Sequence, residues 1–202
     1  MTDAYIYDAI RSPRGKGRPD GALHEVTAVT LSARMLDALA ARNGLARPCR
    51  RRCDLGQCHP SGRAGRMFGA HGGAGVGLDQ SIPGLAINRF CASGIEAVNL
   101  AANQVKGGAG SAYIAGGVEM MGRVPMGSDG AAIAVDPSLA MDTYFVPQGI
   151  SADIIATEYG FTRQMVDALA LESQRRAAAA WADGRFAKSV VPCGRSKRAD
   201  DP

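Results

Sequence analysis

Cys91 is the residue of this sequence whose type and position best suit covalent chemistry. It lies in the run N-R-F-C-A-S-G, residues 88–94, between the apolar segment 85–87 and a segment rich in small apolar residues, 92–106. This places the cysteine at the first turn of a predicted helix, where unpaired N–H groups and a macrodipole of roughly half a positive charge favour a thiolate. Cys91 is therefore a candidate nucleophile, and its backbone N–H is a candidate oxyanion donor.

The alternative for Cys91 is a structural thiol inside the core. Free cysteine is among the most buried residue types, so position alone favours this alternative. Ser93 and Gly94 argue for an open site, because their small side chains keep the first turn narrow enough for a thin substrate to approach. The local sequence leaves both interpretations open.

The elements around Cys91 predict a βαβ unit. Residues 85–87 form a short strand, 92–106 a helix, and 112–115 a second strand that ends at Gly116-Gly117. Such strands are parallel and joined by a right-handed crossover. The helix carries few charges, mainly Glu96 and Lys106, so we expect it to be buried on most of its circumference.

The rest of the chain alternates predicted elements with irregular segments. Asn43-Gly44 and Gly184 are C-terminal stops, and Thr162 is an N-cap. Residues 122–147 are rich in Gly, Pro and Ser and are expected to be irregular until Pro147. The other predicted elements are a buried strand at 4–9, helices at 27–43, 151–159 and 162–183, and the start of a strand at 189–192.

Residues 47–77 differ in composition from the rest of the chain. They hold six arginines against one acid, Asp54, three of the five cysteines and eight glycines, with almost no aliphatic residues to form a core face. We expect this stretch to be mobile and poorly packed.

Three interpretations of this stretch remain. A metal site would use Cys49, Cys53, Cys58 and His59, but their spacing lacks the paired C-x2-C of familiar zinc modules. A basic nucleic-acid loop is weakly supported, because no aromatic residues are interleaved with the arginines. The favoured interpretation is an out-of-frame reading of GC-rich DNA, with shifts near Ala46 and Gly77 and a third near residue 192.

Composition bounds the class of protein. The 202 residues allow one to two domains, and 46% hydrophobic with 21% charged residues is ordinary for a globular chain. No apolar run reaches the roughly 20 residues of a membrane span, and no signal peptide is visible, so we expect a cytoplasmic protein with reduced thiols. The net charge of +4 arises in the 47–77 stretch, so it does not predict a nucleic-acid partner.

The run I-N-R-F-C-A-S-G-I-E-A at 87–97, followed by G-G-V-E-M-M at 116–121, closely resembles the nucleophile motif and the next motif of the thiolases. The residues of this nucleophile motif resemble the degradative 3-ketoacyl-CoA thiolases more than the biosynthetic thiolases. The resemblance covers 4–45 and 78–192, including A-I-R-S-P at 9–13 and the loop-domain-like segments 149–153, 167–177 and 184–186.

The resemblance implies an α/β thiolase fold: two mixed-sheet halves with their nucleophile helices buried between them, and a loop domain that receives coenzyme A. Residues 1–121 are then the N-terminal α/β domain with its anomalous 47–77 stretch, 122–192 a partial loop domain and 193–202 an anomalous tail. The implied reaction is 3-ketoacyl-CoA plus CoA to acetyl-CoA and acyl-CoA, with Cys91 carrying the acyl group as a thioester. CoA is a substrate, and neither a bound cofactor nor a metal is expected. A homo-oligomer like those of the family is expected, although the departure of residues 47–77 from the family pattern argues against it.

The resemblance also implies that this sequence is truncated. In thiolases two catalytic histidines and a second cysteine come from the C-terminal half, and His24, His59 and His71 match none of these motifs. His24 is expected to be solvated. Only the Cys91 thiol and its backbone N–H carry over, so we expect negligible activity from this chain alone. The alternatives are a non-catalytic thiolase-like binding or assembly protein and, further behind, a relative of the ketoacyl synthases, whose motif resembles D-T-A-C-S-S.

Overall fold

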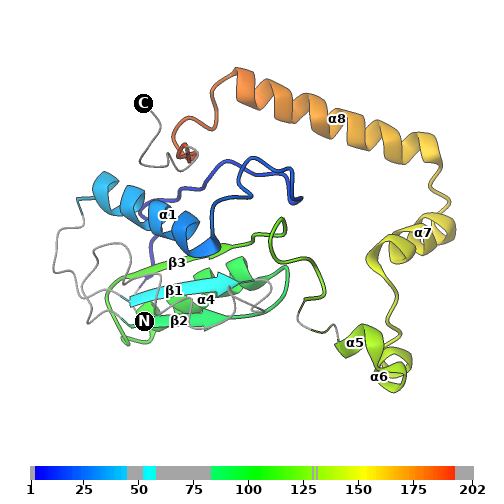
Figure 1. Cartoon of the computed structure of the whole chain (residues 1–202), viewed down its shortest axis with the longest axis horizontal. Coiled ribbons are helices and arrows are strands. Elements are labelled where there is room, and N and C mark those ends of the chain that lie inside the picture. Colours follow the sequence, from blue (N-terminus) through cyan, green and yellow to red (C-terminus); the bar gives the residue numbers. More distant parts are fainter. Residues whose placement is uncertain (1–2, 45–51, 58–82, 129, 131, 194–202) are drawn as a thin grey trace. The chain divides into compact units, whose positions relative to one another are not determined.

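The computed structural model describes residues 3–44, 52–57, 83–128, 130 and 132–193 (Figure 1). Of residues 52–57 and 132 it describes the backbone only. The chain divides into two compact units, one formed by Met1–Asp129 with Ser189–Pro202 and the other by Gly130–Lys188. The sequence-based boundaries were placed instead after residues 121 and 192.

A parallel sheet forms the centre of the first unit. Its strands are β1 (Arg52–Gln57), β2 (Gly84–Ile87) and β3 (Tyr113–Val118), in the order β2-β1-β3. Leu55 on β1 is level with Ala86 on β2 and with Gly116 on β3. The described strand pairs are all parallel, so the antiparallel pairing of a mixed sheet is not seen among these residues.

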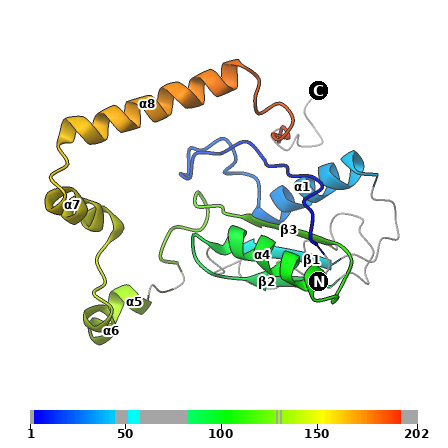
Figure 2. The same ribbon diagram turned by 180° about the vertical axis from the view of Figure 1, so that it is seen from behind.

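Helix α4 (Ser93–Lys106) connects β2 to β3 and packs against β1 and β3. Figures 1 and 2 view the sheet from opposite sides and show α4 across one face of it. The βαβ unit predicted from residues 85–115 is therefore present, with β1 inserted between its two strands. Lys106 in the last turn and Glu96 in the first turn both complement the helix dipole.

Two expectations about the strands are wrong. The 47–77 stretch was expected to be mobile and poorly packed, yet Arg52–Gln57 forms the central strand β1. A parallel ladder is made by backbone groups, so it needs no aliphatic pattern in the strand. The second βαβ strand was expected to end at Gly116-Gly117, but β3 continues through both glycines to Val118, since each still pairs with β1. The rest of 47–77 lies outside the described residues.

The predicted buried strand at 4–9 is also absent from the structure. Tyr5, Ile6 and Tyr7 are 72%, 79% and 92% exposed, and no residue before Arg11 pairs with a described strand. A segment without a ladder partner cannot bury its two faces as a strand does. Pairing in this segment is confined to Arg11, whose N–H donates to the Ser189 carbonyl. The strand predicted to start at 189–192 is present only as the isolated parallel bridge between Arg11 and Val190.

Helix α1 (Ala28–Arg42) forms as predicted, between an N-cap and a left-handed stop. The Thr27 hydroxyl accepts from the Thr30 N–H at 3.1 Å, and Gly44 has a φ of +58°, which suits glycine. The helix also contacts β3. Among the described residues of this unit, Val26, Ala28, Leu31 and Met120 form a buried core cluster, and Leu23, Val118 and Cys193 pack against it.

The second unit is helical. Helices α5 (Ala132–Val135) and α6 (Pro137–Asp142) occur where an irregular segment was expected. Asp136 caps α6 and a proline opens it, which is a local start signal that the Gly- and Pro-rich composition concealed. The predicted helices are confirmed as α7 (Gln148–Glu158) and α8 (Arg163–Ala182).

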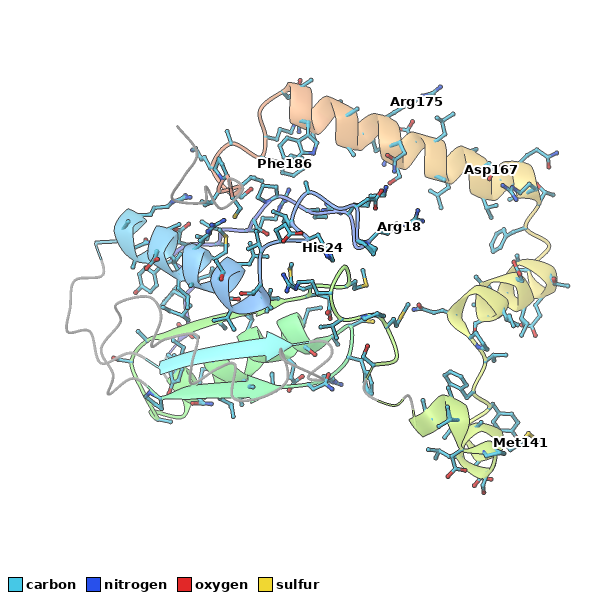
Figure 3. All side chains as sticks on the ribbon, in the orientation of Figure 1. Arg18, His24, Met141, Asp167, Arg175 and Phe186 are labelled. Atoms are coloured by element: carbon cyan, nitrogen blue, oxygen red, sulfur yellow. The ribbon has the colours of Figure 1, made fainter. Side chains whose placement is uncertain are left out.

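Neither α7 nor α8 buries a residue. Most side chains of α8 are exposed, among them Arg175 and Asp167, which pairs with Arg163 at 2.8 Å (Figure 3). Beyond the end of α8, Phe186 turns back to place its ring 4.9 Å from that of Trp181. Among the described residues, no helix combines the length and the apolar character that crossing a membrane requires.

Candidate functional site

Cys91 lies on a sharp turn between strand β2, which ends at Ile87, and helix α4, which begins at Ser93. Its side chain is exposed. The buried structural thiol that position alone favoured is therefore wrong in this structure. Ala92 is the N-cap of α4, and no side chain caps the helix. The Ser93 N–H donates to the Phe90 carbonyl, so the N–H groups of Gly94 and Ile95, which have no acceptor among the described residues, are the ones open to an anion near Cys91.

The residue before the cysteine has an unusual backbone conformation. Phe90 has a φ of +49°, in the left-handed region that residues with a Cβ seldom adopt. Its N–H donates to the Asn88 side-chain oxygen at 2.8 Å. Conformations of this kind persist when their surroundings hold them, and they recur at functional turns that present a nucleophile.

Ser93 is the most enclosed residue of the turn, with no exposed surface. Its hydroxyl oxygen accepts from the Arg89 N–H at 2.8 Å, and the hydroxyl donates to the Phe90 carbonyl at 2.7 Å. The Ser93 N–H also donates to that carbonyl, at 3.0 Å. Ser93 thus bonds, through both its side chain and its main chain, to the backbone of Arg89 and Phe90, the two residues that precede Cys91.

The outer side of the turn is tied to the helix by an ion pair. The Arg89 guanidinium contacts the Glu96 carboxylate at 2.5 Å, although both side chains are partly exposed. A Cβ built on Gly94, one residue into α4, meets no atom within 4 Å. The first turn of the helix is therefore open on its outer side, as its small residues predicted.

The outer face of α4 is exposed, which corrects the expectation of a helix buried around most of its circumference. Only Ser93, Ala97 and Ala101 are buried, and they follow one stripe at a spacing of four residues. Ile95 and Val98 are 70% and 40% exposed. A helix that packs on one sheet buries one stripe, and the apolar residues outside that stripe need a second covering element.

In the described part of the chain, no acid or base is bonded to the thiol of Cys91. No hydrogen bond or ion pair of the described residues involves its thiol. His24 lies on the loop before α1 (Figure 3), where its carbonyl accepts from the Arg123 guanidinium at 3.1 Å. It is not fully solvated as expected, since its Nδ1 atom is buried without a partner, as is one carboxylate oxygen of Glu119. His59 and His71 lie outside the described residues.

Cys193 provides a contrast within the same unit. It packs against the core, and its thiol lies 3.6 Å from the Val191 carbonyl. Burial raises the pKa of Cys193, and the nearby charge of Arg34 only partly opposes this effect. At neutral pH this cysteine is therefore a protonated, half-buried thiol, unlike a nucleophile.

The four residues of the metal-site interpretation cannot be placed. Cys49, Cys58 and His59 lie outside the described residues, and the side chain of Cys53 on β1 is not described. That interpretation stays a prediction.

Sequence reasoning identified Cys91 but not the contacts that shape its turn. The roles of Asn88, Arg89 and Ser93 depend on backbone atoms that sequence spacing does not place. One local signal was available, because asparagine often bonds to the N–H two residues ahead of it in a turn.

Fold and site together define a class: an α/β protein with a parallel sheet that presents a cysteine on a strand-to-helix turn. Residues 4–201 match the family model described as thiolase, N-terminal domain, and the chain belongs to the thiolase family.

The curated relatives are consistent with this assignment. The chain is 33% identical over 193 residues to the 3-ketoacyl-CoA thiolases of Shewanella sp. (strain ANA-3) and Shewanella oneidensis, and 34% identical to that of Shewanella frigidimarina. Each alignment covers 94% of this chain and 49% of the relative. The chain thus spans about half the length of the curated relatives it matches, and it corresponds to their N-terminal half.

Proposed function

We propose that this chain carries the acyl-accepting cysteine of a thiolase-type acyltransferase. The Cys91 thiolate attacks the 3-keto carbonyl of a 3-ketoacyl-CoA, and the bond between C2 and C3 breaks. Acetyl-CoA leaves after its C2 carbanion takes a proton, and the shortened acyl group stays on Cys91 as a thioester. A second CoA thiol then attacks this thioester and releases acyl-CoA, which is covalent catalysis in two steps.

One observation carries the proposal: an exposed Cys91 on a strand-to-helix turn, beside the uncapped N-terminus of α4, within the family's nucleophile motif. The thioester intermediate requires a thiolate and donors for the tetrahedral oxyanion. The helix N-terminus can supply both effects, because its N–H groups and dipole stabilise negative charge. The half-buried Cys193 has neither feature.

The first half-reaction also depends on groups that form no hydrogen bond or ion pair with Cys91 among the described residues, because the acetyl-CoA carbanion is formed and protonated in that step. Proton transfer to or from the acetyl carbanion needs a general acid/base, and each such group is typically worth roughly 10²–10⁴ in rate. A nucleophile and its base act as a unit, so several losses together approach the uncatalysed reaction. We therefore expect the 202-residue chain by itself to accept an acyl group slowly and to turn over negligibly.

A non-catalytic thiolase-like assembly protein is the second candidate function. The observation that favours it is the exposed apolar face of α4, with Ile95 at 70%, next to a cysteine without an acid/base partner. Such a face suits packing against another protein element as well as it suits a half-built active site.

The test uses the purified chain with acetoacetyl-CoA and CoA, and it follows acetyl-CoA formation and protein mass together. We expect an acetyl adduct on Cys91 that CoA removes, no adduct in Cys91→Ala, and turnover near the uncatalysed rate. Absence of the adduct from the folded wild-type chain would favour the assembly protein. Cys91-dependent turnover at ordinary rates of roughly 1–10³ s⁻¹ would show that these residues supply the base themselves.

A further inference from the structure

We propose that Ser93 is a positioning residue whose hydroxyl holds the turn that presents Cys91. The inference rests on the proposed function, because it concerns the same cysteine, but its test does not need acyl transfer. The hydroxyl receives the Arg89 N–H and gives its own proton to the Phe90 carbonyl. These two bonds close a ring around the residues that precede the nucleophile.

The ring spans the strained position of the turn. Phe90 has its φ at +49°, a conformation that an aromatic residue leaves unless other contacts hold it. Its N–H is held by Asn88 and its carbonyl by the hydroxyl and N–H of Ser93. Both peptide groups of Phe90 are thus fixed, and the Ser93 hydroxyl is the side-chain contact at the carbonyl next to Cys91.

Because Ser93 is buried, the hydrogen bonds of its hydroxyl are hard to replace. Ser93 has no exposed surface, so water cannot replace its hydroxyl at the Arg89 N–H and the Phe90 carbonyl without opening the turn. Once the hydroxyl is gone, the turn can relax towards a negative φ at Phe90. That change would move Cys91 away from the N-terminus of α4, whose N–H groups favour the thiolate.

The rival explanation is that Ser93 only stabilises the fold, like any buried residue of α4. The two explanations differ in what they predict for two cysteines of one molecule. Loss of positioning slows the reaction of Cys91 with iodoacetamide and leaves Cys193 unchanged. General loosening exposes the half-buried Cys193 and speeds its reaction.

The experiment measures alkylation rates at Cys91 and Cys193 in the full 202-residue chain by peptide mass spectrometry. Ser93→Ala is compared with the wild type and with Ala97→Gly, a variant that loosens α4 one turn along the same buried stripe. We expect Ser93→Ala to lower the Cys91-to-Cys193 rate ratio on the order of tenfold, within the penalty known for misplaced reacting groups. Ala97→Gly should not lower this ratio.

A double-mutant cycle makes the mechanism itself falsifiable. Glycine adopts a positive φ without steric cost, so Phe90→Gly relieves the strain that Ser93 opposes. In the Phe90→Gly background we expect Ser93→Ala to lower the ratio by clearly less than in the wild-type background. Equal losses in both backgrounds would overturn the proposal that Ser93 acts through Phe90.

The proposal fails equally if Ser93→Ala leaves the wild-type ratio unchanged or lowers it only by speeding Cys193. The proposed function fails differently, through the absence of an acetyl adduct on wild-type Cys91. If Ser93→Ala lowers the Cys91-to-Cys193 rate ratio but wild-type Cys91 never accepts an acetyl group, the positioning role of Ser93 is supported and the proposed acyl transfer is contradicted.

Discussion

The side-chain oxygen of Asn88 accepts a hydrogen bond from the backbone N–H of Phe90 at 2.8 Å, two residues ahead of it. This contact occupies the donor of a residue whose φ is +49°, immediately before the candidate nucleophile Cys91. Asparagine and Ser93 therefore hold the same strained residue from opposite sides, one from the strand end and one from the helix.

Asn88→Ala should lower the free energy of unfolding by about 0.5–1.5 kcal/mol, the usual net contribution of one hydrogen bond. The lower part of this range is expected because Asn88 is exposed and water can replace the oxygen. Asn88→Asp is the matched control, since its carboxylate keeps the acceptor. Urea unfolding of the three proteins measures the effect, and equal losses in both variants would show that the acceptor is irrelevant.

The two described cysteine side chains should respond differently to pH. Burial raises the pKa of Cys193, so its thiol stays protonated at neutral pH and its alkylation increases only as pH rises towards that pKa. At pH 7 the exposed Cys91 should be alkylated first. Timed iodoacetamide labelling between pH 6 and pH 10 measures this, with Cys91→Ala as the control. Preferential labelling of Cys193 at pH 7 would count against the nucleophile assignment.

Asp8 should make folding stability depend on acid. The Asn43 amide donates to its carboxylate at 2.8 Å and is the main cause of the lowered pKa of Asp8. Desolvation opposes this shift, and the Ala9 N–H and the charge of Arg42 add smaller effects that lower the pKa further. A carboxyl group whose pKa is lower in the folded state stabilises the fold above its unfolded pKa of about 3.9. This stabilisation disappears as pH falls through the folded-state pKa.

The expected result is that Asn43→Ala lowers the melting temperature at pH 7 and that its difference from the wild type shrinks as pH falls through the lowered pKa of Asp8. Once the carboxylate is protonated in both proteins, the amide no longer has an anion to stabilise. Asn43→Asp is unsuitable as a control because it adds a like charge, whereas Asp8→Asn tests the same contact from the other side. A difference that stays constant with pH would contradict the assignment.

Trypsin should cut slowly after Arg52 in the folded chain. Arg52 begins the central strand β1, where it is level with Tyr113 on β3, and a paired strand must open before a protease can bind it. Arg185, in the turn after α8, provides an internal control of an exposed bond that should be cut early. Rapid cleavage at both sites under native conditions would mean that β1 is not a stable part of the sheet.

The sequence alone was sufficient for features that depend on local signals. Thr162 marked the start of α8, and Gly44 and Gly184 marked the ends of α1 and α8, because caps are satisfied within a few residues of the chain. Cys91 was located in the same way, from a short strand and a helix on either side of it and from the motif that resembles the thiolases.

Only the tertiary structure decided which segments pair and which faces are covered. The arginine-rich residues Arg52–Gln57 became the central strand, whereas the apolar residues 4–9 formed none, because pairing depends on distant backbone partners more than on composition. The turn at Cys91 follows the same principle. The positive φ of Phe90 is unfavourable locally, and it is offset because the Ser93 hydroxyl donates to the Phe90 carbonyl. Ser93 is fully buried, and burial is a property of the folded chain that the local sequence does not determine.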